Sequence, residues 1–130
     1  MTEPGRRRPI EDEASAPFWA AAREGRLVVQ QLADGTLRWP PSPAPMLAQP
    51  PDWREVSGRG TVWSYSVVVR SSHPAPPTPY VMAIVELEEG PFVFTNVVAV
   101  DPAAMSIGMP VEVDFEPLGD DRRLPVFRPS

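Results

Sequence analysis

From residue 56 onward, apolar residues recur at every second position in short runs. Such alternation is typical of strands that bury one face of a sheet, and turn residues separate the runs. The first run places Trp63, Tyr65 and Val67 on one face and Ser64 and Ser66 on the other. Further runs follow at 81–87, 92–98, 111–116 and 124–127. The pattern therefore predicts a sheet built from these five runs.

Gly58 and Gly60 stand at the start of the first run. Glycine weakens a strand but permits the bend that a small closed barrel requires. Together with the alternating runs, this bend predicts a five-stranded antiparallel barrel of the OB-fold type over residues 56–130.

The N-terminal part of the chain lacks this alternation and contains a short predicted helix. Ser15 suits its N-cap, Pro17 its first turn and Gly25 its C-terminal stop. Phe18 and Trp19 lie on adjacent faces of this helix. Two large neighbouring rings cannot both enter one small core, so we expect one of them to meet another surface. They are either an anchor for a partner subunit or the residues that pack the helix onto the barrel.

Composition narrows the class of protein. The chain has 130 residues, about one domain, and no cysteine, which excludes disulfides and thiol chemistry. A net charge of −5 weighs against tight nucleic-acid binding, because that affinity comes largely from neutralising phosphates. The apolar runs are strand-sized, so no membrane span is predicted. Arg6-Arg7-Arg8 precedes no apolar signal core, and we expect a cytoplasmic protein.

A set of short motifs follows a fixed order along the chain. They are Phe18-Trp19, Gly25-Arg26-Leu27, Ser57-Gly58-Arg59-Gly60-Thr61-Val62, Pro79-Tyr80-Val81, Glu86-Leu87-Glu88-Glu89-Gly90, Ile107-Gly108-Met109-Pro110-Val111-Glu112-Val113 and Leu124-Pro125-Val126-Phe127-Arg128-Pro129. In this order and spacing the set resembles a bacterial and archaeal family of acyl-CoA-associated proteins, formerly a domain of unknown function. That family pairs a rubredoxin-like zinc ribbon with an OB-fold, and the resemblance extends from Phe18 to Pro129.

The family's ribbon carries its zinc on the pattern C-x2-C-x10-C-x2-C. Aligned on Pro40-Pro41, these four positions fall on Gln31, Asp34, Pro45 and Ala48. None can supply a thiolate, so we expect a degenerate, zinc-free ribbon and no cofactor. The polar residues 1–14 predict a flexible tail. The resemblance implies a helix and degenerate ribbon over 15–55 and an OB-fold over 56–130.

Members of this family are usually small partners of acyl-CoA enzymes. The resemblance therefore implies a non-catalytic accessory subunit that scaffolds a thiolase-like or aldolase-like partner in a hetero-oligomer and contacts acyl-CoA. An accessory role to a MaoC-type hydratase is an alternative.

Three arginines are candidates for contacts with a CoA phosphate, because arginine forks suit phosphate oxygens. Arg59 lies between two glycines, where its side chain can reach outward. Arg23, Arg26 and Arg38 could also form a phosphate-facing patch. The alternative is that Arg59 is a surface residue beside the barrel bend. Phe18, Trp19 and Trp39 are the candidate docking residues for a partner.

Two other functions rest on fewer residues. His73, the one histidine, could serve as a general base, but no nucleophile or orienting carboxylate stands at a recognisable spacing. Trp63, Tyr65, Phe92 and Phe94 could stack the bases of a single-stranded nucleic acid. We favour the alternative that these aromatic residues fill the barrel interior.

Overall fold

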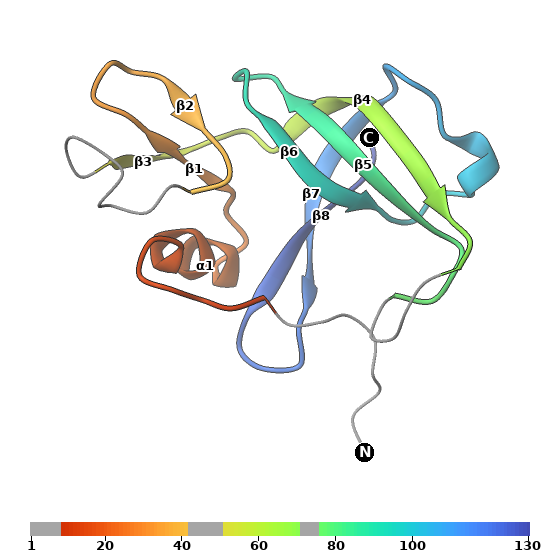
Figure 1. Cartoon of the computed structure of the whole chain (residues 1–130), viewed down its shortest axis with the longest axis horizontal. Helices are drawn as coiled ribbons and strands as arrows, with labels where there is room; N and C mark the ends of the chain where they lie inside the picture. Colours follow the sequence, from red (N-terminus) through yellow and green to blue (C-terminus); the bar gives the residue numbers. More distant parts are fainter. Residues whose placement is uncertain (1–8, 42–50, 71–75) are drawn as a thin grey trace.

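The computed structural model describes residues 9–41, 51–70 and 76–130 (Figure 1). One short helix, α1 (Ala16–Arg23), precedes a three-stranded sheet and a closed barrel. The sheet contains β1 (Val28–Gln31), β2 (Leu37–Arg38) and β3 (Asp52–Glu55). The barrel contains β4 (Arg59–Val68), β5 (Tyr80–Leu87), β6 (Phe92–Val97), β7 (Pro110–Pro117) and β8 (Arg123–Pro129), with the 3-10 helix η2 (Pro102–Ala104) between β6 and β7. The chain is mainly β, as the alternation predicts.

The barrel closes in the order β4-β5-β6-β8-β7, and β7 returns to β4, where Gly60 pairs with Val111. One pairing is parallel, between β6 and β8 at Val97 and Phe127. The prediction of an all-antiparallel barrel is therefore wrong in this detail. After β6 the chain crosses to the far side and lays β7 beside β4, so the hairpin partner β8 runs in the direction of β6.

A bulge in β4 reverses the faces expected for this strand. Its pairing with β5 shifts between Val62 and Ser64. Val62 is buried before the shift, Trp63 is 56% exposed, and Tyr65 is half-buried after it. The prediction that Trp63 and Tyr65 share one face is wrong, because an inserted residue inverts the alternation beyond it.

Aliphatic residues, mostly valine, fill the barrel interior together with one aromatic ring, that of Phe127. A five-stranded barrel is narrow, and it leaves little room for aromatic rings. Trp63, Phe92 and Phe94 are exposed instead, which contradicts the expectation that the alternating aromatics fill the core. The buried positions of the barrel strands are Val62, Val81, Ala83, Val85, Leu87, Val93, Val97, Val111, Val126 and Phe127.

Gly58 and Gly60 permit the close approach of strands at the barrel bend. Gly58 has a φ of +79°, in the region that favours glycine. A Cβ added at Gly60 would collide with the backbone oxygen of Glu86 on β5. The predicted bend thus coincides with the point where β4 pairs with both β5 and β7.

The ribbon region forms the sheet β2-β1-β3, with β1 in the centre. A tight turn joins β1 to β2, in which Gly35 N–H donates to Leu32 C=O at 2.8 Å. The Asp34 carboxylate accepts the backbone N–H of Thr36 at 2.9 Å. One backbone hydrogen bond and one side-chain hydrogen bond therefore stabilise this turn.

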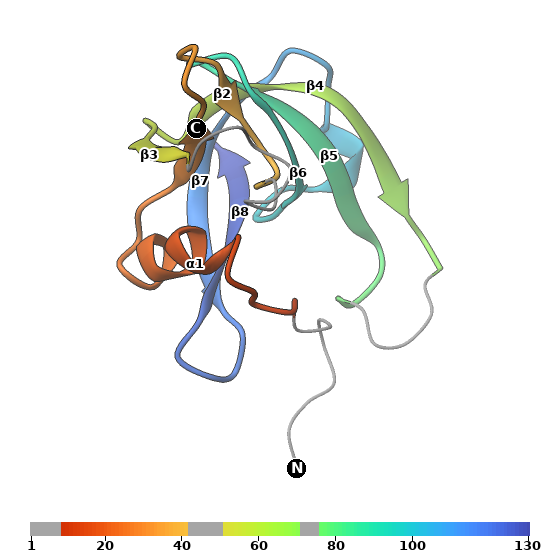
Figure 2. The same cartoon turned by 60° about the vertical axis from the view of Figure 1, so that its left-hand side comes forward.

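Helix α1 lies beside β7 and β8 (Figure 2). Both of its large rings are buried, with Phe18 7% and Trp19 5% exposed and an edge-to-face contact of 5.2 Å between them. The guanidinium of Arg122, from the turn between β7 and β8, lies 5.4 Å from the Trp19 ring centre. The expectation that one ring meets another surface is therefore wrong. The helix packs sideways into the angle between the ribbon and the barrel, and this angle has room for both rings.

The N-terminal segment next to α1 makes specific contacts from residue 9 onward. Arg122 Nη1 donates to Pro9 C=O at 2.7 Å, and Arg23 forms an ion pair with Glu11 at 2.9 Å. Residues 1–8 of the expected flexible tail lie outside the described residues. No helix in the described part of the chain is both long and apolar enough to cross a membrane.

Candidate functional site

The Arg59 side chain forms an ion pair with the Glu88 carboxylate. Its Nε donates to Glu88 Oε1 at 3.1 Å, and this hydrogen bond lowers the pKa of Glu88. Glu89, the next residue, accepts the Ser57 N–H at 2.8 Å. The two glutamates of the β5–β6 turn thus hold the start of β4, and the charge of Arg59 is already paired with that of Glu88.

Arg23 is also paired, in a different place. It forms ion pairs with Glu11 at 2.9 Å and with Asp121 at 3.2 Å. These contacts join the N-terminal segment, α1 and the β7–β8 turn. Arg26 is paired as well, with Glu24 and Glu55. Of the three arginines considered from the sequence as one phosphate-facing patch, Arg23, Arg26 and Arg38, the first two therefore already hold carboxylates.

Arg38 lines a groove of about 560 Å³ between the three-stranded sheet and the β5–β6 turn. We call it the ribbon–barrel groove, and its lining includes Arg38, Trp39, Arg54, Glu89 and Phe92. Neither Arg38 nor Arg54 forms an ion pair with any described residue. Two arginines and two aromatic rings in one groove are suited to an anion that carries a ring system.

Sequence reasoning missed Arg54. It pairs with Val29 on one side of β1, while Arg38 pairs with Gln30 on the other. Both arginines line the groove because their strands, β2 and β3, flank the central strand β1. The spacing of residues in the sequence does not predict that Arg38 and Arg54 line the same groove. The alternation Trp53-Arg54-Glu55 does indicate a strand.

The predicted docking residues fall into two groups. Phe18 and Trp19 are buried beneath the chain's own surface. Trp39 is half-buried and lies in the ribbon–barrel groove. Of the three, Trp39 is the one that can directly meet a ligand or partner.

Two of the four positions that align with the family's cysteines, Gln31 and Asp34, lie among the described residues. Gln31 ends β1, and Asp34 stabilises the following turn through Thr36. Pro45 and Ala48 lie outside the described residues, as does His73. Among the described residues, no cluster of three or more histidine, aspartate or glutamate side chains could hold a metal ion.

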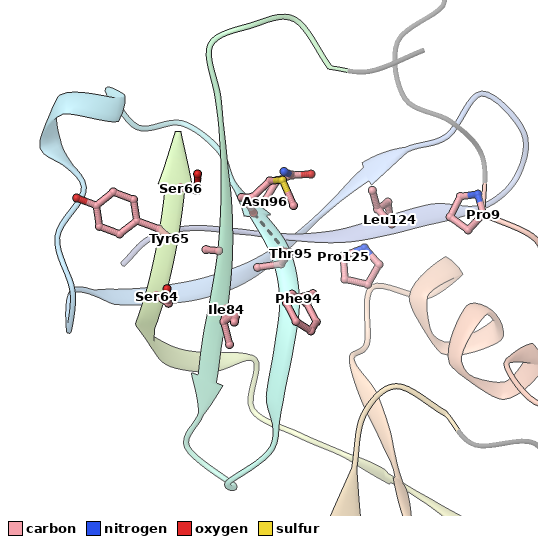
Figure 3. Close-up of a pocket in the computed structure, with 12 residues that line it drawn as sticks. Pro9, Ser64, Tyr65, Ser66, Ile84, Phe94, Thr95, Asn96, Leu124 and Pro125 are labelled. Carbon is pink, nitrogen blue, oxygen red and sulfur yellow. Dashed lines mark hydrogen bonds between the residues drawn. The ribbon is translucent and has the colours of Figure 1, made fainter. Parts of the chain in front are cut away.

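A second pocket, of about 470 Å³, lies on the outside of β5 and β6 (Figure 3). Ile84 and Phe94 line it from paired positions on neighbouring strands, and Leu124, Pro125 and Pro9 line it from the other side. Tyr65 points away from these residues, and its hydroxyl donates to Met105 C=O at 3.2 Å. The sequence prediction missed this pocket because it assigned Phe94 to the barrel interior.

Comparison with known proteins identifies the family. A family model described as the C-terminal OB-fold domain of ChsH2 matches residues 53–116. One chain of the solved Ltp2-ChsH2(DUF35) aldolase is 42% identical, with a TM-score of 0.83 over 94% of this chain and 98% of that one. The chain belongs to the DUF35 family.

The chain also matches parts of two longer curated relatives. A probable enoyl-CoA hydratase alpha subunit of Thermomonospora curvata is 42% identical over 96% of this chain, which spans 40% of that protein. A DUF35 domain-containing scaffold protein of Methanocaldococcus jannaschii is 42% identical over 52% of this chain, which spans 48% of the scaffold. The DUF35 chain therefore spans less than half the length of these relatives.

Proposed function

We propose that this DUF35 chain is a non-catalytic accessory subunit of an acyl-CoA-processing enzyme. The observation that carries the proposal is its near full-length likeness to one chain of an aldolase whose name joins two components, Ltp2 and ChsH2(DUF35). The scaffold name of the archaeal relative supports the same role.

The partner that we propose is a thiolase-like or aldolase-like subunit in a hetero-oligomer. The name of the Thermomonospora relative favours a second candidate, a hydratase such as a MaoC-type enzyme. Both partners act on acyl-CoA, so the accessory role itself does not depend on the choice between them.

The ribbon–barrel groove is the contact for CoA that we propose. Of the three arginines expected from the sequence to contact CoA, Arg38 lines this groove, and Arg54 lines it as well. Arg23 and Arg59 are left out of the proposed contact because their charges are already paired with carboxylates. The arginines would hold phosphate oxygens, and Trp39 and Phe92 offer apolar surface for the attached adenine. A single-stranded nucleic acid fits less well, because the chain carries a net charge of −5.

Co-purification from the native host tests the accessory role. The tagged full chain is isolated at moderate salt, and its companions are identified and quantified by mass spectrometry. We expect a thiolase-like or aldolase-like subunit in a simple ratio. A hydratase in that ratio would select the second candidate, whereas isolation of the chain alone or with nucleic acid would contradict the proposal.

A further inference from the structure

Exposed apolar side chains gather on the outside of β4, β5 and β6. We call this set the outer aromatic face, and it consists of Trp63, Met82, Ile84, Phe92 and Phe94. Trp63 is 56%, Met82 48%, Phe92 44% and Phe94 66% exposed, and Ile84 is half-buried. The rings of Trp63 and Phe92 meet edge to face, with 5.3 Å between their centres.

The strand register makes this face continuous. Ile84 on β5 is paired with Phe94 on β6, and Glu86 is paired with Phe92 two positions along. Cross-strand neighbours on one face of a sheet lie in contact distance. Single exposed apolar residues are ordinary, but a contiguous group of this size marks an interaction surface.

The outer aromatic face carries one charge, at its end nearest the β5–β6 turn. Glu86 faces outward between Thr61 on β4 and Phe92 on β6, and it forms no ion pair with any described residue. No arginine belongs to this set of outward positions. The face therefore presents an apolar surface with a single carboxylate.

The pocket described above adjoins this face. It has a volume of about 470 Å³, and Ile84 and Phe94 form one wall while Leu124 and Pro125 form the other. The gap exists because β6 pairs with β8 at one register position, Val97 with Phe127, and the strands separate beyond it. A side chain of leucine or phenylalanine size on a partner could enter this pocket and bury its apolar surface.

We propose that the outer aromatic face is the docking surface for the acyl-CoA enzyme subunit, an inference that rests on the proposed function. The partner presents an apolar side chain to the pocket and an arginine or lysine to Glu86. The negative charge of Glu86 favours such a partner over a second copy of the chain or a nucleic acid. A second copy of the chain meeting the same face would place two Glu86 carboxylates together without a cation, and a nucleic acid would bring phosphates to Glu86.

A charge placed on this face tests the proposal. The affinity of the full chain for the separately purified partner enzyme, identified by co-purification, is measured by calorimetry for wild type and for Phe94→Glu. We expect the variant to bind about 30-fold more weakly or worse, because aromatic residues dominate interface energies. Ile107→Glu is the matched control, since Ile107 is 64% exposed and stands in the turn before β7, outside the residues that define this face, and it should bind within about twofold of wild type.

Further measurements separate the possible results. Thermal unfolding of the free chains shows that the Phe94→Glu chain is folded, and Glu86→Gln should weaken binding and reduce its dependence on salt. Equal binding by wild type and Phe94→Glu would overturn the docking surface while the accessory role stands. Failure of wild type to bind any acyl-CoA enzyme would instead defeat the proposed function. A homodimer that Phe94→Glu dissociates, or an oligonucleotide complex that it abolishes, would also overturn the proposal.

Discussion

At the scale of single residues, two tryptophans of this DUF35 chain have opposite environments. Trp19 is 5% exposed, in contact with Phe18 and beneath the Arg122 guanidinium, whereas Trp63 is 56% exposed on the barrel's outer surface. Their sequence surroundings suggested the reverse, with Trp19 available to a partner and Trp63 in the core. Burial depends on where the helix packs and where a bulge falls, and neither is a property of the residue itself.

Replacing these tryptophans should therefore have unequal effects on stability. Trp19→Ala removes a buried ring and leaves a cavity, which we expect to lower the free energy of unfolding by about 3–5 kcal/mol. Trp63→Ala should lower it by about 1 kcal/mol or less, because most of that ring already meets water. Guanidinium denaturation of both variants measures the difference. Similar losses in the two variants would contradict the burial of Trp19.

At the scale of elements, hydrogen bonds stabilise the β1–β2 turn, where the resemblance to the family places two of the zinc ligands. Asp34 occupies a position where the family's ribbon carries a cysteine, and its carboxylate accepts the Thr36 N–H. Gly35, with a φ of +88°, provides the left-handed backbone that the turn requires. The turn is thus held by hydrogen bonds and by the backbone freedom of Gly35.

The Asp34 carboxylate makes stability depend on acid. Hydrogen bonds with Thr36, its side chain first and then its backbone, lower the pKa of Asp34 in the folded chain. The folded state then favours the ionised carboxylate, so its stabilisation is present above the unfolded pKa and is lost as pH falls through the folded pKa. Between about pH 5 and about pH 2.5, wild type should lose more stability than Asp34→Asn. Thermal midpoints across this range measure the difference, and parallel curves would rule out a role for the carboxylate.

The same element carries a prediction about metal. Without thiolates at Gln31 and Asp34, we expect no stoichiometric zinc, and chelator should leave the thermal midpoint of the chain unchanged. Elemental analysis of protein from the native host measures the metal. A family member that retains its four cysteines is the control and should lose stability in chelator. About one zinc per chain would overturn the alignment on Pro40-Pro41.

At the scale of the whole molecule, the arrangement of the two sheets creates the ribbon–barrel groove. Arg38 and Arg54 come from one sheet, and Glu89 and Phe92 come from the barrel. Neither sheet alone contains the groove. The proposed CoA contact therefore belongs to the tertiary structure and not to any one segment.

Arg54→Ala should weaken the binding of CoA by about tenfold or more, because a charge-assisted contact with phosphate contributes roughly 1.5–3 kcal/mol. Arg128→Ala is the control, since Arg128 lies on β8 outside the groove lining and is paired with Asp114. Calorimetry with CoA and with dephospho-CoA measures both the affinity and its dependence on the ribose phosphate. Equal affinities for wild type and Arg54→Ala would remove the groove from the proposed function.

The amino-acid sequence by itself determined the strands, the turns and the family. The runs at 81–87, 92–98 and 111–116 coincide closely with β5, β6 and β7, and Gly25 ends α1 with a φ of +75°. These features follow from local spacing and from residues whose backbone preferences are strong. The motif order also indicated an acyl-CoA-associated family, which the match to a DUF35 chain confirms.

Only the tertiary structure decided which side of each strand faces the core and which charges meet. One bulge between Val62 and Ser64 turned Trp63 outward, and the crossover after β6 made its pairing with β8 parallel. The pairing of Arg59 with Glu88 and the presence of Arg38 and Arg54 in one groove involve residues far apart in the chain. Periodicity reports a strand's two faces but not which is buried, and side-chain partners depend on pairings that no local pattern encodes.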